Sequence, residues 1–227
     1  MSGTVTPRHL VVFGRPGSGK STLATRLGAE QGFQLIQTGE LLRAAVRRGD
    51  LLGQRVHKHL ISGNLVPDRL IFELLEQCLT APDQQKLLFD GFPRTMGQVT
   101  LLENFERKLG FEIERFVEIA ISREEAVSRL TGRRICSQCG ATYHVRFNPP
   151  RGVGLCDIDN TPLHTRPDDS LEVVEVRQQV YDEHALPILD YYSKQFPDRF
   201  RRIDGEQRLE AVYEETCKVL GFRPVKH

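Results

Sequence analysis

Five short apolar runs alternate along the chain with longer stretches in which apolar residues recur at helical spacing. The runs predict strands and the stretches predict helices. The predicted strands are 9–13, 33–36, 86–89, 116–121 and, more weakly, 199–203. The predicted helices are 20–31, 40–48, 69–79, 98–109, 124–131, 172–195 and 206–220. Strands that alternate with helices indicate parallel pairing, so the fold class is α/β, with a five-stranded parallel sheet between two helical layers.

Two segments interrupt this alternation. Residues 37–66 are helical and contain no strand, although they lie between two strand candidates. Residues 132–169 are rich in Gly, Pro and Cys and carry β-prone residues, which is typical of a small β insertion. We therefore expect a single domain over 1–227 with two insertions, one helical and one a small sheet.

Composition limits the partners and the compartment. The formal net charge of +1 gives no general attraction to nucleic acid or to an anionic membrane. No apolar stretch approaches the ~20 residues of a membrane span, and the first residues lack the apolar core of a signal peptide. The five cysteines are odd in number, and three lie in one segment, which argues against a disulfide framework. We expect a cytoplasmic protein that binds neither nucleic acid nor membrane.

The segment "FGRPGSGKST" matches the phosphate-binding pattern G-x-x-x-x-G-K-[ST]. It follows a predicted buried strand and opens a helix, which is the context that this pattern requires. Backbone N–H groups, the helix N-terminus and a lysine would then surround the phosphates of a nucleoside triphosphate. The residues expected to bind ATP here are Gly17, Ser18, Gly19, Lys20, Ser21 and Thr22. Asp90 ends another apolar strand and, with Ser21, is the expected partner of Mg²⁺.

A second group of basic residues lies outside this loop. Arg43 and Arg94 fall on segments away from the phosphate loop, and the phosphate of a monophosphate acceptor would need such separate donors.

Six motifs in order now carry a family resemblance: "GRPGSGKST", "TGELLRAAV", "GNLVPD", "DGFPRTMGQ", "GRRICSQCGATYHVRFNPP" and "TRPDD". Over nearly its whole length the chain resembles the adenylate kinases of the long bacterial type. The resemblance implies a P-loop fold, a monomer, and the reversible Mg²⁺-dependent reaction of ATP and AMP to two ADP.

The resemblance also implies roles for individual residues. The AMP site would consist of Thr38, Arg43, Asn64, Leu65, Val66, Gly91, Phe92, Pro93, Arg94, Gln98, Arg166 and Arg177. The groups around the transferred phosphate would be Lys20, Arg94, Arg129, Arg133, Arg166 and Arg177, with Asp168 and Asp169 at the hinge of a lid. Arg133, Thr142, Tyr143 and Gln207 would contact ATP. Gln98 can donate to and accept from an adenine edge at once, which a pyrimidine does not match.

Two positions depart from the family pattern. Ser21 and Thr22 stand where the family usually has Gly-Thr, and Arg15 stands where the family usually has a small residue. The Arg15 side chain must either point out of the loop or reach towards the acceptor phosphate.

The cysteine-rich insertion has the spacing of a metal site. Cys136 and Cys139 form a C-x-x-C turn, and Cys156 with Asp159 forms a C-x-x-D turn. Three thiolates and one carboxylate can complete a tetrahedral zinc site, which would be structural because no position stays open for water. The resemblance agrees, since long bacterial members include both four-cysteine and three-cysteine-plus-Asp lids. Alternatives for the fourth ligand are Asp157, His144 and His164, and the thiols could also carry no metal.

Two other functions remain open at this stage. A related nucleoside monophosphate kinase would use a different donor or acceptor base. A nucleic-acid-binding ATPase would use the zinc ribbon as its reader, although the chain shows no basic stripe.

Overall fold

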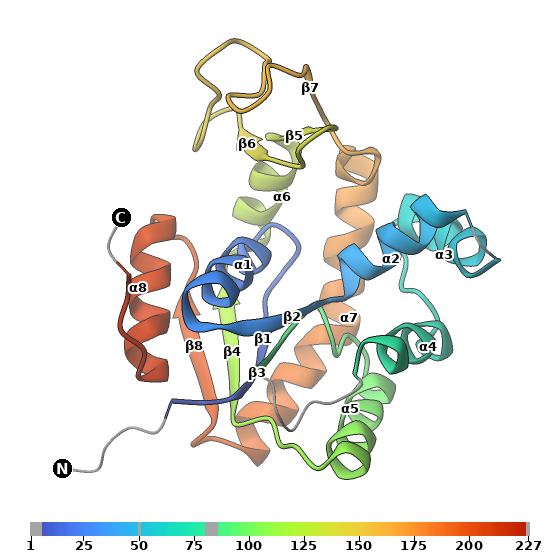
Figure 1. Ribbon diagram of the computed structural model, residues 1–227, viewed down its shortest axis with the longest axis vertical. Helices are drawn as coiled ribbons and strands as arrows, with labels where there is room; N and C mark the ends of the chain where they lie inside the picture. Colours follow the sequence, from blue (N-terminus) through green and yellow to red (C-terminus); the bar gives the residue numbers. More distant parts are fainter. Residues whose placement is uncertain (1–5, 50, 80–85, 226–227) are drawn as a thin grey trace.

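A computed structural model describes residues 6–49, 51–79 and 86–225. Its centre is a five-stranded parallel sheet in the order β2-β3-β1-β4-β8 (Figure 1). The strands are β1 (His9–Phe13), β2 (Phe33–Gln37), β3 (Lys86–Asp90), β4 (Arg115–Ala120) and β8 (Phe200–Asp204). The predicted α/β class with five parallel strands is confirmed, and the weakest predicted strand forms an edge.

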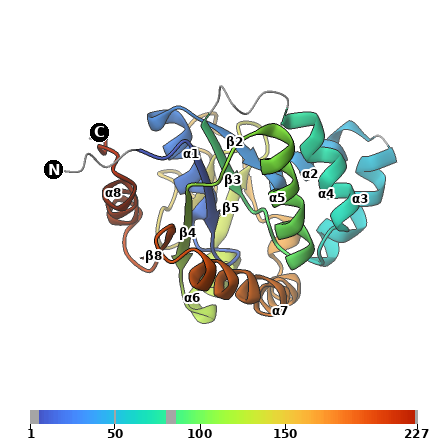
Figure 2. The same ribbon diagram turned by 90° about the horizontal axis from the view of Figure 1, so that it is seen from below.

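Helices cover both faces of the sheet. The core helices are α1 (Lys20–Gln31), α4 (Asp68–Cys78), α5 (Met96–Leu109), α7 (Leu171–Gln195) and α8 (Leu209–Leu220), and α6 (Arg123–Thr131) packs against α7. One face packs against α1 and α8, and the other packs against α5 and α7 (Figure 2).

The central strand shows why the layers form. All five residues of β1 are buried, and successive side chains point to opposite faces. Leu10 and Val12 join the core under α1 and α8, whereas Val11 and Phe13 join the core under α5 and α7. A strand covered on both faces is therefore continuously apolar, as its sequence is.

The first insertion consists of two helices, α2 (Thr38–Arg48) and α3 (Leu51–Ser62), without a strand. They approach closely at Gly53, where a Cβ would overlap with the carbonyl group of Ala45. In Figure 1 the pair projects to one side of the sheet, beyond the carboxyl end of β2.

The second insertion is a small antiparallel sheet in the order β6-β5-β7. Its strands are β5 (Arg133–Cys136), β6 (Thr142–His144) and β7 (Leu163–His164), and η2 (Pro167–Asp169) leads from it into α7. Three buried residues, Cys136, Tyr143 and Cys156, form its small core. We call residues 132–169 the lid, and Figure 1 shows it above the large sheet, between α6 and α7.

Some predicted boundaries differ from the observed ones. The last helix begins at Leu209 and not at residue 206, because the preceding residues form a turn in which Asp204 Oδ1 accepts from Glu206 N at 2.9 Å. Helix α5 begins at Met96 and not at residue 98, because the Thr95 side chain caps it by accepting a hydrogen bond from Gln98 N. Within the described ranges, no helix has both the length and the apolar character that crossing a membrane requires.

Candidate active site

Residues 14–19 form a tight loop between the end of β1 and the start of α1. Gly14 and Gly17 have φ of +152° and +95°, and a Cβ at either would lie within 2.8 Å of a backbone carbonyl, that of Ile119 or of Ala126. Only glycine therefore allows the loop to lie so close to its neighbours. The Ser18 hydroxyl is buried in this loop and bonds to no other described group. An inward-turned loop at a helix N-terminus is a ready anion site.

Lys20 reaches back along this loop. Its Nζ donates to Arg15 O at 3.2 Å. The side chain keeps partial access to the open cleft, but protein atoms surround the ammonium, and this burial lowers the pKa of Lys20. The charge of Asp90 opposes the shift, those of Arg94, Arg177 and Arg133 add to it, and together these effects lower the pKa to about 8. The loop therefore gathers positive charge that a polyanion would neutralise.

Arg166 lies in the same field. Burial, followed by the charges of Arg133 and Arg43, lowers the pKa of Arg166 to about 10. Arginines that depress one another's pKa lie close together without enough anions between them. Such a group is suited to bind several phosphate oxygens at once.

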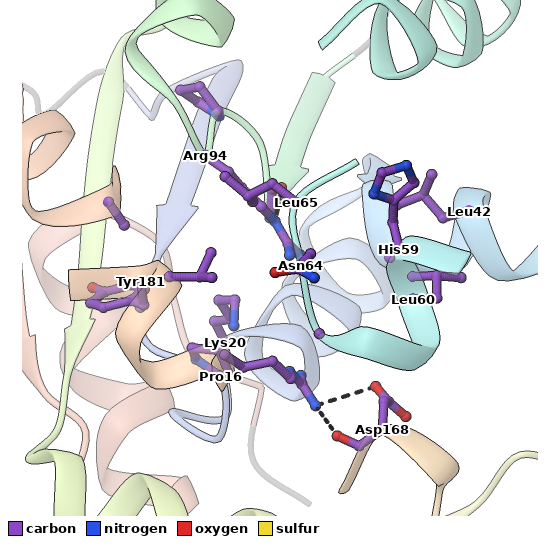
Figure 3. Close-up of a pocket in the computed structure, with 18 of the residues that line it drawn as sticks. Pro16, Lys20, Leu42, His59, Leu60, Asn64, Leu65, Arg94, Asp168 and Tyr181 are labelled. Carbon is purple, nitrogen blue, oxygen red and sulfur yellow. Dashed lines mark hydrogen bonds and ion pairs between the residues drawn. The ribbon is translucent and has the colours of Figure 1, made fainter. Parts of the chain in front are cut away.

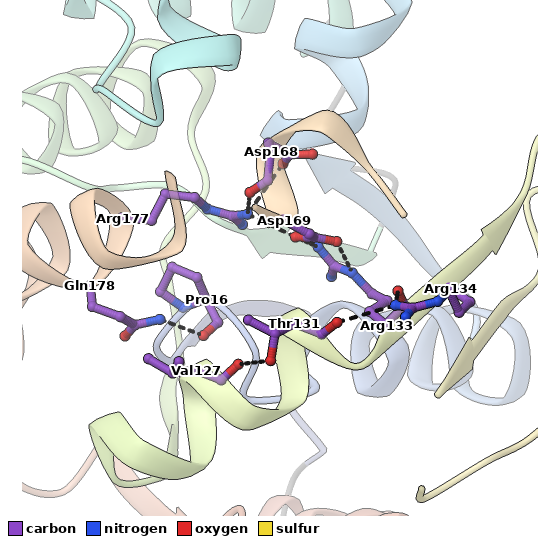
Figure 4. A network of polar contacts seen from close by, with 9 residues as sticks. All are labelled: Pro16, Val127, Thr131, Arg133, Arg134, Asp168, Asp169, Arg177 and Gln178. Carbon is purple, nitrogen blue, oxygen red and sulfur yellow. Dashed lines mark hydrogen bonds and ion pairs between the residues drawn. The ribbon is translucent and has the colours of Figure 1, made fainter. Parts of the chain in front are cut away.

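Asp169 orients two of these arginines (Figure 4). Its carboxylate is fully buried and accepts from Arg133 Nε at 2.8 Å and from Arg133 Nη2 at 2.6 Å. It also accepts from Arg177 Nη1 at 3.2 Å, and Arg177 donates to Asp168 O at 2.8 Å. One carboxylate thus connects β5 of the lid with α7 of the core.

A cavity extends from the phosphate loop to the α2–α3 insertion (Figure 3). Its charged part includes Lys20, Arg94 and Arg177. Its other part is mainly apolar and includes Leu42, Leu60, Leu65 and also His59. A cavity with a cationic end and an apolar end matches a nucleotide, which has a phosphate tail and a flat base.

Asp90 ends β3 beside the phosphate loop. The residue is 5% exposed, and its Oδ1 finds no hydrogen-bond partner among the described residues. Its Oδ2 accepts from Gln37 Nε2 at 3.3 Å. A buried carboxylate oxygen that lacks a donor is suited to a hydrated Mg²⁺ ion, which prefers oxygen ligands. The residues present therefore fit that ion.

The lid brings the four predicted metal ligands together. One ligand atom from each of Cys136, Cys139, Cys156 and Asp159 lies within 4.8 Å of the others. The Asp159 carboxylate accepts from Thr161 N at 3.0 Å, and backbone bonding of this kind holds the pKa of Asp159 well below its usual range. It therefore remains an anionic ligand.

The alternative fourth ligands lie outside this cluster. The carboxylate of Asp157 accepts from Arg151 N at 2.8 Å. The Nδ1 atom of His144 faces two backbone N–H groups at 3.0 and 3.1 Å, and His164 is not among the clustered residues. The spacing argument for Asp159 and this geometry agree.

Comparison with known proteins identifies the family. The family model described as adenylate kinase matches residues 12–196. The chain belongs to the adenylate kinase family. It is 42% identical to an adenylate kinase of Carboxydothermus hydrogenoformans over 212 residues, which cover 93% of this chain and 98% of that protein. It is 40% identical to one of Brevibacillus brevis over 213 residues (93% and 99%) and 39% identical to one of Pyrococcus abyssi over 214 residues (94% and 96%).

In this adenylate kinase family member, several residues predicted for AMP line the cavity. They are Arg43, Asn64, Leu65, Gly91, Pro93, Arg94 and Arg177. Four others are buried beside it and are 6% exposed or less: Thr38, Val66, Phe92 and Gln98. Thr38 Oγ1 donates to Gly91 O at 2.6 Å, which ties the start of α2 to the loop after β3.

The residues predicted for ATP outside the phosphate loop, and Arg129, which is predicted for the transferred phosphate, are less concentrated. Arg129 pairs with Glu125 at 2.7 Å on its own helix. Thr142 is exposed, whereas Tyr143 is 7% exposed and its hydroxyl lies 3.5 Å from Cys156 Sγ, so this side chain belongs to the lid core. Gln207 Nε2 donates to Asp204 O and to Glu215. These four assignments stay predictions.

Sequence reasoning missed the attachment of the phosphate loop to α7. Arg15 points away from the cavity, pairs with Asp182 at 2.6 Å and lies 4.8 Å from the centre of the Tyr181 ring. Gln178, which is fully buried, donates to Pro16 O at 3.1 Å. The first of the two orientations considered for Arg15 is the observed one. No local pattern could have indicated it, because the partners are more than 160 residues apart.

Proposed function

We propose that this adenylate kinase family member transfers the terminal phosphoryl group of ATP to AMP and gives two ADP. The observation that carries the proposal is the group of cationic side chains around Lys20, with Arg94, Arg133 and Arg177 close enough to depress its pKa. A cavity continues from this group to an apolar wall on the α2–α3 insertion, where an acceptor nucleotide would lie.

The reaction needs no base from the protein. The AMP phosphate, whose second pKa is about 6, is already ionised near neutral pH. The site must align two polyanions and stabilise the charge that spreads over the transferred group. Lys20 and the arginines supply that charge, and Asp169 holds two of the arginines in place before the substrates bind.

Asp90 and Ser21 are the residues that we expect to hold Mg²⁺ together with ATP. The buried Asp90 Oδ1 without a donor supports this role. When bound, the ion would neutralise part of the phosphate charge.

The lid, in this proposal, carries a structural Zn²⁺ ion on Cys136, Cys139, Cys156 and Asp159. The lid core is a cluster of three buried residues, Cys136, Tyr143 and Cys156, and so small a unit commonly needs a metal to fix its shape. Closure of such a lid over the nucleotides excludes water; this step comes from the known behaviour of adenylate kinases and not from this structure. We further expect the protein to act as a monomer in the cytoplasm, without nucleic-acid or membrane partners.

A coupled assay tests the function. Purified protein with Mg²⁺ and ATP should phosphorylate AMP in preference to GMP, CMP and UMP, and should convert ADP into ATP and AMP in the reverse direction. Faster turnover of another monophosphate would identify a related kinase with a different acceptor. ATP hydrolysis without any acceptor activity would refute phosphoryl transfer between nucleotides.

A further inference from the structure

Asp68 joins two segments that border the cavity. It is the first residue of α4, and only Pro67 separates it from residues 64–66. Its Oδ1 accepts from Gln98 Nε2 at 2.7 Å, and its Oδ2 accepts from Thr95 Oγ1 at 3.0 Å. A Cβ at Gly97 would lie 2.5 Å from Asp68 Oδ2, so the carboxylate rests against the first turn of α5.

The second contact of Gln98 comes from the backbone. Its Oε1 accepts from Arg94 N at 2.8 Å. A carboxylate can only accept a hydrogen bond and a backbone N–H can only donate one, so both contacts require the same orientation of the Gln98 amide. Gln98 is 2% exposed, and its orientation is therefore determined by protein groups and not by water.

We propose that Asp68 is a positioning residue that selects the acceptor base through Gln98. The proposal rests on the proposed function and on contact between Gln98 and the base in the AMP complex. After its two protein contacts, the amide retains one N–H donor and one acceptor lone pair, in a fixed order. Adenine presents an N6 donor beside an N1 acceptor, whereas guanine presents an O6 acceptor beside an N1 donor.

The two purines thus require opposite amide orientations. A glutamine that could turn by 180° about its last torsion would match either base. A glutamine held by Asp68 and Arg94 N matches one base only, and membership of the adenylate kinase family indicates that this base is adenine. Asp68 would exclude GMP without touching any nucleotide.

The variant Asp68→Asn tests this role. Its side chain keeps the shape of Asp68, but it can accept from Gln98 Nε2 or, once turned, donate to Gln98 Oε1. The ratio of kcat/KM for AMP to kcat/KM for GMP, at saturating ATP, should fall about tenfold, which is the discrimination expected of one hydrogen bond. Most of the change should appear in KM for the monophosphate, and KM for ATP should stay constant.

Glu76→Gln is the matched control. Glu76 also lies on α4 and also bonds to a side chain of α5, Lys108 Nζ at 3.1 Å, but both partners are largely exposed. The same loss of charge there should leave the AMP to GMP ratio unchanged. A change in the control as large as in Asp68→Asn would overturn the proposal.

A double-variant cycle separates positioning from a structural effect. In Gln98→Leu the amide is gone, so adding Asp68→Asn should lower the ratio no further. If Asp68→Asn reduces activity with AMP and GMP equally, Asp68 is only structural and the proposal fails. If Gln98→Leu retains the parent ratio, Gln98 does not read the base, and the proposal fails even where Asp68→Asn does not fold. Failure of the proposed function would look different, because the parent protein itself would not phosphorylate AMP.

Discussion

Replacing Asp169 with asparagine should destabilise the whole protein, because this carboxylate pairs with two site arginines at once and is itself out of water, and only Arg177 keeps a second anion, Asp168 at 3.2 Å. The Asp169 side chain is 0% exposed, while those of Arg133 and Arg177 are each 21% exposed. Asp169→Asn keeps the shape but removes the charge. Arg133 and Arg177 then face a neutral amide that cannot accept three charged hydrogen bonds.

The magnitude follows from the burial. Removing one partner of a buried ion pair typically costs about 3–5 kcal/mol, because the remaining charge is left without compensation. The remaining exposure of the two guanidinium groups lets water recover part of this loss, so we expect the lower end, about 3 kcal/mol. For a chain of this length about 1 kcal/mol corresponds to about 2–4 °C, so Tm should fall by about 6–12 °C.

Thermal and urea unfolding measure this difference, and Asp190→Asn is the matched control. Asp190 pairs with Lys194 at 2.8 Å on the same helix, α7, but these side chains are 61% and 69% exposed. Exposed pairs contribute little, so the control should lose less than about 0.5 kcal/mol. If the two variants differ by less than about 1 kcal/mol, burial does not give the Asp169 network its strength, and the reasoning is wrong.

Three further outcomes follow from the site. The value of kcat/KM for ATP should fall about tenfold per pH unit above about 8, because Lys20 in the free enzyme, with its pKa lowered to about 8, then loses its proton. The value of kcat at saturating ATP should stay constant to higher pH, and a constant kcat/KM up to pH 10 would contradict this reasoning. Removal of the lid metal by a strong chelator should release one zinc ion per chain and lower Tm, and purified protein without bound metal by elemental analysis would refute the zinc site. Arg15→Ala and Asp182→Asn should each raise KM for ATP by about threefold and leave KM for AMP unchanged, with no further effect in the double variant; additive effects would show that the pair does not act as a unit.

The sequence predicts those parts of the fold that depend on local patterns. The apolar run of β1 marked a strand because each of its side chains is buried on one face or the other, whereas the edge strand β8, which buries only Ile203, gave the weakest signal. The phosphate loop was equally predictable, since its glycines are required where a Cβ at Gly14 or Gly17 would lie within 2.8 Å of a neighbouring carbonyl oxygen. The cluster of Cys136, Cys139, Cys156 and Asp159 was predicted from spacing and from the family resemblance, because each turn of the C-x-x-C type places its two candidate ligands together.

Contacts between distant segments could not be predicted. Arg15 lies in a recognised motif, yet its partner Asp182 is on a helix that begins more than 150 residues later. Tyr143 was assigned to ATP by its place in a motif, and only the folded lid shows that its side chain packs against Cys156. Gln98 was assigned by its place in the family motif and by its residue type, and its contact with Asp68 appears only when α4 and α5 meet. Motifs report what a residue can do, and packing decides which of its atoms remain free.

The arrangement of charges also explains why the cationic site can exist before any phosphate binds. The positive charges that lower the pKa of Lys20 oppose folding, because a lysine with a lowered pKa is less stable in its charged form in the folded protein than in the unfolded chain. The buried Asp169 carboxylate offsets this cost for Arg133 and Arg177, and Asp90 offsets it for Lys20 itself. The phosphates of two nucleotides would therefore add negative charge to a site whose donors are already oriented, so that less of the binding free energy is lost in ordering side chains. Because Arg133 belongs to β5 and Arg177 to α7, the proposed contacts with the phosphates would also draw the lid towards the core, and nucleotide binding and lid position would then be coupled through the charges of these two arginines.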